Sequence, residues 1–349
     1  MSTTPDPAHY SAQIAALAED QEREHARLLV LRANAYLAAM EFQPGRADLD
    51  AAAALHRQGG RSAEHAKCLH LAATASRLSG DLHGARDRAE LSKTLAPTDS
   101  PMAVSALAEL GETWAALGDP RTAAAYCEQA AETGARAGLL PTAQAQLLRR
   151  AGSNWVQAGV PSRAALIPLR KAAELLTGAG DIAGAVRARI EEASAWAATS
   201  DPTRDGFNAS YREQAEQAMG QARIQAEGVH DLPALADLAM LRSTLALYDR
   251  DLESALLAAQ EAQALALKAV QPLPYTTSTL AISRLSDEKG DRLQAYRALA
   301  VGWATLGDLM GEEVGQATFA PKLQELVSSW GEEEFVRVRD AYAASRRAQ

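Results

Sequence analysis

Apolar positions recur with helical spacing along almost the whole chain, and short turns interrupt them at regular intervals. The pattern predicts helical hairpins near residues 20–58, 62–95, 102–137, 141–177, 182–227, 232–268 and 275–306. A further helical segment is predicted over 319–345, after the repeating pattern fades beyond Gly311. The sequence therefore predicts an all-α protein.

Gly-Asp dipeptides mark several of the predicted turns. They lie at Gly80-Asp81, Gly118-Asp119, Gly180-Asp181, Gly290-Asp291 and Gly307-Asp308. Glycine tolerates the left-handed conformation that ends a helix. Aspartate accepts hydrogen bonds from the free N–H groups of the next helix and suits its positive end. Each dipeptide is therefore predicted to end one helix and begin the next.

Three tryptophans show that the hairpins repeat in sequence. Trp114, Trp155 and Trp196 recur at intervals of 41 residues in similar contexts. The chain here resembles the tetratricopeptide repeat family. The resemblance rests on the third hairpin, with Leu110-Gly111, Trp114, Gly118-Asp119, Ala123 and Ala130, and on the fourth, with Gly152, Trp155, Gly159 and Ala164. The period near 40 exceeds the family's common repeat of about 34 residues and is similar to longer variants in bacterial regulators and scaffolds.

The resemblance implies a right-handed α-solenoid of about seven hairpins. We expect residues 1–310 to form the array, with a degenerate first repeat, and residues 311–349 to form a C-terminal helical cap. Ser329 and Glu332 have the spacing of a capping box at the start of a cap helix. The segment between Ala198 and Ala209 replaces a tight turn with a longer loop, and we interpret it as a tolerated surface insertion in preference to a functional element.

Composition is consistent with a folded, acidic protein. Hydrophobic residues make up 47%, charged residues 23% and aromatic residues 5%, and the net charge is −9. This balance disfavours nucleic acid and anionic membranes as partners. No signal peptide or membrane-spanning stretch is recognisable, and two distant cysteines indicate no disulfide framework. A cytoplasmic location is expected by elimination.

The motifs of common enzymes and metal sites are missing from the sequence. It contains no phosphate-binding GxxxxGK[ST] loop and no HExxH motif. His65, Cys68 and His70 form the nearest metal-like cluster, but His70 is rotated away from the face that the other two share. We interpret Cys127 and the repeating Trp114, Trp155 and Trp196 as core residues. No catalytic residue, cofactor or metal is predicted, and the protein is expected not to be an enzyme.

The resemblance also implies where a partner would bind. In the tetratricopeptide family the first helix of each hairpin lines a concave groove. The corresponding positions here are Asn34, Lys67, His70, Thr74, Arg77, Gln146, Arg149, Ser153, Arg187, Ser194 and Arg284. Many are basic or polar, which favours a protein or peptide with an acidic segment or a free C-terminal carboxylate. Scattered arginines that only solubilise the surface remain an equal alternative. Asn34 matches an asparagine of the family's carboxylate clamp, but Thr74 and Glu112 replace its neighbours, so a chaperone-tail receptor is disfavoured.

Three functions remain open from the sequence. The leading hypothesis is a non-enzymatic scaffold or adaptor that binds a protein or peptide in the groove. The second is a sensor module that binds a small molecule or peptide and acts on a separate output protein. The third is an α-helical enzyme whose site forms only in three dimensions. Self-association through a face carrying Phe319, Leu323 and Leu326 is left undecided.

Overall fold

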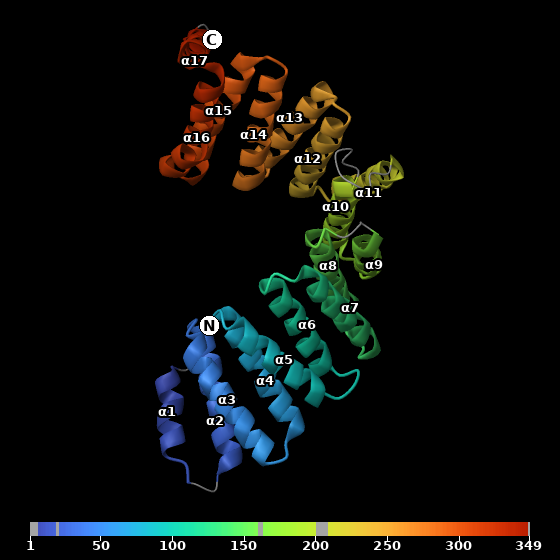
Figure 1. Ribbon diagram of the computed structural model, residues 1–349, viewed down its shortest axis with the longest axis vertical. Helices are drawn as coiled ribbons and strands as arrows, with labels where there is room; N and C mark the ends of the chain where they lie inside the picture. The colour runs from blue at the N-terminus through green and yellow to red at the C-terminus, as the bar shows by residue number, and fades with distance from the viewer. Residues whose placement is uncertain (1–5, 19–20, 160–162, 200–208, 348–349) are drawn as a thin grey trace. The chain divides into compact units, whose positions relative to one another are not determined.

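The computed structural model describes residues 6–18, 21–159, 163–199 and 209–347 (Figure 1). Within these ranges the regular secondary structure is entirely α-helical, as predicted. The helices are α1 (Pro7–Ala15), α2 (Glu22–Ala38), α3 (Phe42–Gln58), α4 (Ser62–Leu78), α5 (Leu82–Leu95), α6 (Pro101–Ala116), α7 (Pro120–Arg136), α8 (Pro141–Gln157), α9 (Arg163–Gly178), α10 (Ile182–Thr199), α11 (Ala209–Gly228), α12 (Leu232–Tyr248), α13 (Leu252–Lys268), α14 (Pro272–Glu288), α15 (Arg292–Met310), α16 (Glu312–Trp330) and α17 (Glu332–Arg347).

The helices from α2 onward form consecutive antiparallel pairs, so the predicted helical-repeat solenoid is confirmed. We call the even-numbered helices α2 to α16 the A helices and their odd-numbered partners α3 to α15 the B helices. Helix α1 precedes the first pair, packs on α2 and was not predicted. The chain divides into two compact units, unit 1 with residues 1–181 and unit 2 with residues 182–349. Most of the unusual loop between Ala198 and Ala209 lies outside the described residues.

The turns within the hairpins follow the predicted chemistry. Gly80, Gly118 and Gly290 have φ angles of 86°, 83° and 81°, in the left-handed region where glycine carries no side-chain penalty. The aspartates that follow cap the next helix; Asp81, for example, accepts from the Gly84 N–H at 3.0 Å. These dipeptides therefore act as helix stop and start signals.

The prediction of a turn at Gly307-Asp308 was wrong, because both residues lie inside α15. The chain turns instead at Gly311, with φ of 101°. Gly307 serves packing: a Cβ at Gly315 of α16 would lie only 3.1 Å from the Gly307 nitrogen. The glycine spacing in this hairpin thus reflects close helix approach.

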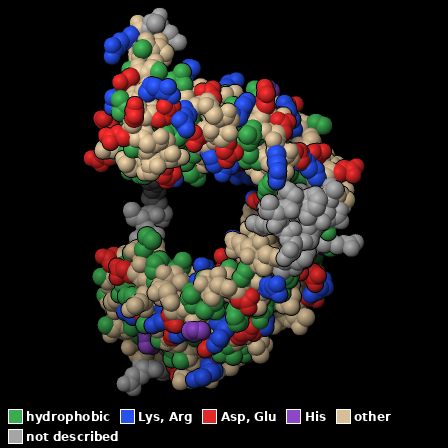
Figure 2. Space-filling model, turned by 45° about the horizontal axis from the view of Figure 1, so that its top comes forward, with side chains coloured by type: hydrophobic (Ala, Val, Ile, Leu, Met, Phe, Trp, Pro, Cys, Tyr) green, Lys and Arg blue, Asp and Glu red, His purple; other side chains and the backbone are tan. Residues whose placement is uncertain are grey.

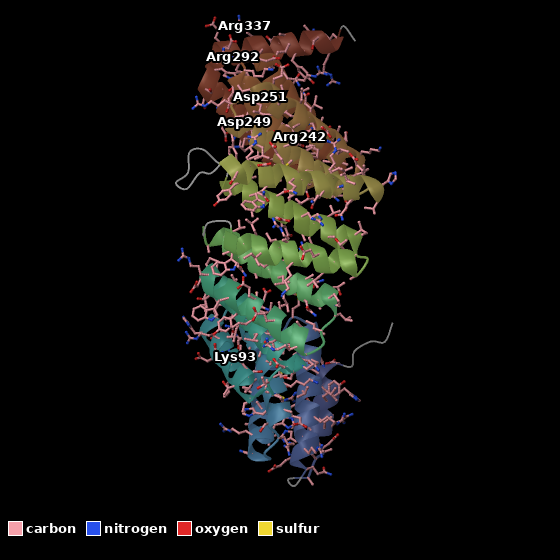
Figure 3. All side chains as sticks on the ribbon, turned by 90° about the vertical axis from the view of Figure 1, so that its right-hand side faces the viewer. Lys93, Arg242, Asp249, Asp251, Arg292 and Arg337 are labelled. Carbon is pink, nitrogen blue, oxygen red and sulfur yellow. The ribbon has the colours of Figure 1, made fainter. Side chains whose placement is uncertain are left out.

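The C-terminal segment contains two helices, α16 and α17, packed on α15. The predicted capping box is not formed, because Ser329 lies within α16 and the chain turns at Gly331, with φ of 85°. Phe319 and Leu326 are 0% and 8% exposed and belong to the core with Leu299 and Leu306. Glu334 joins α17 to α15 by an ion pair with Arg292 at 3.0 Å, and within α17 it also pairs with Arg337 at 2.5 Å (Figure 3).

Alanine dominates the core of both units, and this lets the helices pack closely. The repeating tryptophans border this core to different degrees. Trp196 is 9% exposed, whereas Trp114 and Trp155 are half-buried, and Trp114 packs against Ala73, Ala89 and Leu110. Cys127 is buried as predicted, and burial raises the pKa of its thiol to about 11.

Candidate binding groove on the A helices

The A helices approach one another at several steps of the array. α4 contacts α6 in unit 1, and α10 contacts α12 and α12 contacts α14 in unit 2. Within each unit, no pair of successive B helices from α3 to α15 makes as extensive a contact between described residues. Each of these steps therefore bends with the A helices on its inner side, as expected where hairpins stack into a curved array.

In unit 1 the predicted groove residues differ in accessibility. Asn34, Lys67, Gln146 and Ser153 are exposed on α2, α4 and α8, and Arg149 is half-buried. Arg149 interacts within the chain. These residues lie on A helices, as predicted, but no described cavity joins them into one site.

His70, Thr74 and Arg77 of α4 face Glu109 of α6. The Glu109 carboxylate is only 6% exposed and accepts from Arg77 Nε at 2.6 Å and from Thr74 Oγ1 at 2.9 Å. Burial lowers the pKa of His70, which favours its neutral form at neutral pH. A buried charge needs such partners, so this cluster chiefly ties two A helices together. The sequence analysis missed Glu109 because this residue follows no repeat motif.

In unit 2, Arg187 and Ser194 are exposed on α10, and Arg187 acts electrostatically on Asp237 of α12. Desolvation by the surrounding protein, followed by the charge of Asp231, raises the pKa of Asp237, while Arg187 lowers it. The charges of Arg187 on α10 and of Asp231 at the start of α12 therefore both act on the carboxyl group of Asp237.

The remaining predicted residue, Arg284, lines an open cavity of about 530 Å³. We call this cavity the unit 2 groove. It is bounded by the A helices α12, α14 and α16 together with Leu299 of α15, and its apolar surface comes from Met240, Leu280, Leu299 and Leu326. Its size lies within the usual range of ligand and side-chain pockets, about 300–1,000 Å³.

Two cations flank the unit 2 groove from different helices. Arg284 of α14 is 64% exposed, and the nearest ion-paired carboxylate, Glu288 on the same helix, lies 3.8 Å away. Lys322 of α16 pairs with Glu325 at 2.6 Å, and both are largely exposed. Asp287 is held by Trp330 Nε1, which donates to it at 2.7 Å. Arg284 thus has the weakest internal pairing among these charges.

Lys322, Glu325 and Asp287 were missed by the sequence analysis. Residues 319–345 carry no recognisable repeat pattern, so α16 was treated only as part of a cap. Its spacing after α15 could have indicated an eighth A helix, because Glu312–Trp330 occupies the place of a first hairpin helix.

Metal-ligating side chains do not gather into a site in the part of the chain that the structure describes. No group of three or more metal-ligating side chains converges there. Burial raises the pKa of the Cys68 thiol to about 11, which disfavours the reactive thiolate. Acidic and basic side chains are interspersed on the face shown in Figure 2. No helix of the described chain has both the length and the apolar character needed to cross a membrane.

Comparison with known proteins shows similarity at the level of fold. No protein family and no curated protein match the sequence. Among solved structures, a signal transduction ATPase with numerous domains and a tetratricopeptide repeat sensor, from Pyrococcus horikoshii, aligns with a TM-score of 0.58 and 15% identity over 94% of this chain. The chain spans 46% of that protein's length.

Other solved structures are similar at lower scores. The kinesin light chain TPR-like repeats of Podosopora anserina align at 16% identity, covering 62% of this chain and 100% of that one, with a TM-score of 0.48. Aspartyl phosphate phosphatase F from Bacillus subtilis aligns at 10% identity, covering 87% of this chain and 81% of that one, also with a TM-score of 0.48. The likeness at a TM-score of 0.58, together with the consecutive helix pairs, shows that the fold is a tetratricopeptide-like helical repeat.

Proposed function

We propose that the protein is a non-enzymatic scaffold or adaptor that binds a protein or peptide along its A helices. The observation that carries this proposal is the unit 2 groove, which is lined by apolar side chains and by two cations, the exposed Arg284 and the partly exposed Lys322, on neighbouring A helices. An apolar floor supplies binding energy, and a few polar groups fix orientation. Residues 1–310 supply the array in this proposal, and residues 311–349 cover its end.

An acidic segment is the partner chemistry that we propose for the groove. Arg284 and Lys322 would pair with carboxylates that arrive from solvent, while Leu280 and Leu326 receive an apolar side chain between them. Asn34, Lys67, Gln146, Ser153 and Arg187 remain proposed contacts elsewhere on the A helices. Arg77 is a weaker candidate, because Glu109 already engages its guanidinium.

A charge-reversal series tests this function. The intact protein, the Arg284→Glu/Lys322→Glu variant and an Arg297→Glu/Arg339→Glu control would each be used to capture partners from native lysate. The control makes the same charge change at exposed arginines of α15 and α17. The dissociation constant of each purified captured protein would then be measured. We expect binding at least about tenfold weaker in the groove variant, from loss of two charge-assisted contacts, and unchanged binding in the control.

The two possible failures have different meanings. Equal binding by all three proteins, with unchanged melting, would contradict the groove as the site while keeping the scaffold. Absence of any saturable protein partner would contradict the scaffold itself.

The second candidate is a sensor module that acts on a separate output protein. It is favoured by the fold similarity to a protein whose repeats are described as a sensor. A screen of metabolites by thermal stabilisation tests it, because a ligand that binds only the folded state raises the melting temperature. A saturable increase in the absence of any protein partner would favour the sensor.

A further inference from the structure

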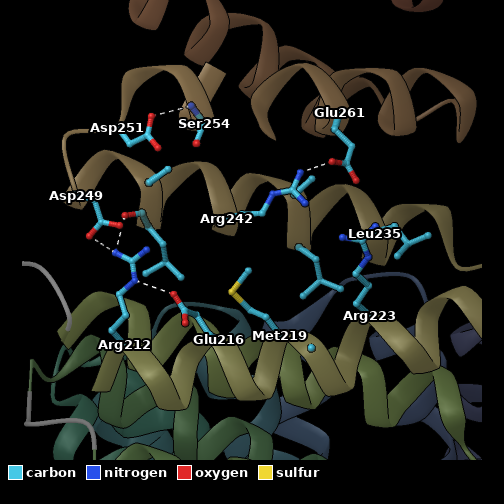
Figure 4. Close-up of a pocket in the computed structure, with 15 residues that line it drawn as sticks. Arg212, Glu216, Met219, Arg223, Leu235, Arg242, Asp249, Asp251, Ser254 and Glu261 are labelled. Carbon is cyan, nitrogen blue, oxygen red and sulfur yellow. Dashed lines mark hydrogen bonds and ion pairs between the residues drawn. The ribbon is translucent and has the colours of Figure 1, made fainter. Parts of the chain in front are cut away.

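A second cavity lies between the A helix α12 and the B helices α11 and α13, and it shares no lining residue with the unit 2 groove. It has a volume of about 470 Å³ and is formed by α11 and α13 at its sides and α12 at its floor (Figure 4). Helix α11 packs on α12 less extensively than the other B helices pack on the A helix that follows, α9 and α10 aside. The loose step between these two helices creates the cavity.

The side chains of α11 explain this loose step. Arg212, Glu216, Met219 and Arg223 line the cavity from α11, and such long side chains hold the two helices apart. Gly220 lies among them, and a Cβ added there would meet no heavy atom within 4 Å. The cavity therefore remains open beside Gly220, on the face of α11 that carries these side chains.

The floor of the cavity is apolar. Leu235, Leu238, Ala239, Leu245 and Ala246 of α12 line it, together with Met219 from α11. Leu238 and Leu245 are 4% and 2% exposed and are fixed by the core beneath them. A ligand here would bury an apolar body against rigid side chains, which is favourable at about 25 cal/mol per Å².

One end of the cavity is acidic. Three carboxylates, those of Glu216, Asp249 and Asp251, line this end, and Arg212 is the arginine beside Glu216 and Asp249. Arg212 pairs with Glu216 at 3.0 Å and with Asp249, and it donates to the Leu245 carbonyl at 3.0 Å. Asp251 accepts from the Ser254 N–H at 3.0 Å through one oxygen. A carboxylate has about four lone-pair sites, so this end retains acceptors for a cation.

The other end of the cavity is richer in arginine. Arg223 and Arg242 line it with one carboxylate, Glu261. Arg242 pairs with Glu261, and the charge of Glu261 also acts on Arg223, so the three side chains are close together. Arg223 pairs with Glu227 at 2.8 Å outside the lining. Each guanidinium has five N–H donors, and only part of them is used by these contacts.

From this opposed arrangement we propose that the cavity binds a small zwitterion with an apolar body. Its ammonium group lies at Asp249 and Asp251, its carboxylate at Arg223 and Arg242, and its apolar part on the leucines of α12. The polarity of the two ends sets the orientation of the ligand.

The length of the cavity narrows the ligand class. Arg242 and Asp249 are seven residues apart on α12, and Leu235 and Asp249 are fourteen apart, which correspond to roughly 10 and 21 Å at 1.5 Å per residue. An α-amino acid is too short to reach both ends. An extended peptide of about three to six residues fits, at roughly 3.3–3.6 Å per residue, as does a long ω-amino acid.

Methionine NMR tests this proposal in the intact protein. Met219 lines this cavity and Met240 lines the unit 2 groove, so ¹³C-methyl labelling reports the two sites separately. The probe is the peptide Ala-Leu-Ala-Leu with free termini, compared with its N-acetylated and C-amidated forms and with 8-aminooctanoate. Met219→Leu and Met240→Leu variants assign the signals.

We expect a saturable shift of the Met219 signal with the free peptide and none at Met240. Blocking either terminus should weaken binding at least about tenfold. Acetylation removes the ammonium charge and amidation removes the carboxylate charge, so each change removes one charge-assisted contact. If 8-aminooctanoate binds as well as the peptide, the two charged ends are sufficient for recognition. If the peptide binds and 8-aminooctanoate does not, the ligand class is restricted to peptides. Equal affinity of the blocked peptides, a shift only at Met240, or no saturable shift with either probe would overturn the proposal.

A cavity-filling variant separates binding from folding. Gly220→Leu places a side chain in the open space, and Gly228→Leu makes the same change at the exposed end of α11, where nothing lies within 4 Å. We expect calorimetry to show binding lost in Gly220→Leu and kept in Gly228→Leu, with both variants folded by circular dichroism. Unchanged affinity in a folded Gly220→Leu protein would refute the location.

Discussion

At the scale of single residues, one position of the A helix shows how the same packing problem is solved in two ways. A Cβ at Gly111 would lie 2.7 Å from Cys127 Sγ and 3.3 Å from the Ala123 carbonyl oxygen. Ser243 and Ser283 occupy the equivalent position, and their hydroxyls donate to Ala255 and Ala295 at 2.7 and 3.0 Å. The hairpin therefore accepts a residue here only if it is very small or bonds the facing carbonyl.

A close contact of this kind with a backbone atom predicts a destabilising substitution. A Cβ at Gly315 would lie 2.8 Å from the Trp303 carbonyl oxygen, and backbone atoms cannot move aside cheaply. We expect Gly315→Ala to lower the free energy of unfolding by about 1–3 kcal/mol, as measured by denaturant titration. Gly220→Ala is the matched control, because its Cβ is unobstructed and alanine should add about 0.5–1 kcal/mol of helix stability. Similar stabilisation of both variants would contradict the close packing of α16.

Three histidines of unit 1 predict acid sensitivity. Burial lowers the pKa of His56, His65 and His70, and Arg61 Nε donates to His56 Nδ1 at 2.9 Å. The unfolded chain, with histidine pKa values near about 6.5, then binds more protons than the folded chain. Stability contributed by the neutral histidines is therefore full above that value and is lost as pH falls from it towards the folded pKa values.

Urea unfolding between pH 7 and 5, followed by far-ultraviolet circular dichroism, tests the expected loss of stability at the lower pH. A triple His→Gln variant should show a flatter dependence over the same range, whatever its absolute stability. An equally steep loss in the variant would assign the effect to other groups.

At the scale of elements, the turns between helices are uniform in backbone and varied in sequence. Met40, Arg250 and Val270 adopt φ angles of 61°, 60° and 53°, the region that Gly80 and Gly290 occupy elsewhere. The left-handed conformation costs a residue with a Cβ about 1–2 kcal/mol, and a β-branched residue is a particular outlier. Backbone strain is therefore concentrated in the glycine-free turns.

Val270 provides the direct test of this strain. Its side chain is 64% exposed, so little packing is lost on its removal. We expect Val270→Gly to raise the free energy of unfolding by about 1 kcal/mol, visible as a higher melting temperature. Val229→Gly, at a residue without positive φ at the end of α11, should not stabilise the protein. A loss of stability in Val270→Gly would show that the turn is not strained.

The helices were largely predictable because their signals are local. Gly-Asp turns and the tryptophan period placed most hairpins to within a few residues. The errors concern helix ends that depend on tertiary packing. Gly307 continues α15 because α16 packs against it, and Ser329 remains in α16 because the chain turns at Gly331. Helix α1 was missed because it lies before the first repeat.

At the scale of the whole molecule, stability depends on contacts between neighbouring helices, since the extensive contacts described within each unit join helices that are adjacent or next but one in sequence. Local opening should follow the quality of these contacts. Hydrogen exchange of the intact protein would compare α11, which packs loosely on α12, with α13. We expect α11 amides to exchange at least about tenfold faster, a difference of roughly 1.4 kcal/mol in opening free energy. Equal protection would contradict the loose step.

The candidate sites were less predictable than the fold because they depend on which residues meet across the array. Arg284 was identified from its position within an A helix, but its neighbours Lys322 and Glu325 come from a helix without a repeat motif. Arg77 satisfied the same positional rule, yet Glu109 of the next A helix engages it. Position within a repeat defines a face, and only tertiary contacts show which charges on it are available.

The two buried cysteines make the natural chain a convenient background for site-specific labelling. Cys68 and Cys127 are 3% and 1% exposed, and the pKa values of their thiols are raised to about 11. Maleimide dyes should therefore react with neither thiol while the protein is folded. One cysteine introduced on the surface of each unit would then accept a fluorophore without removal of the native thiols. Energy transfer between two such dyes would measure the distance between the units in solution, with and without a bound partner.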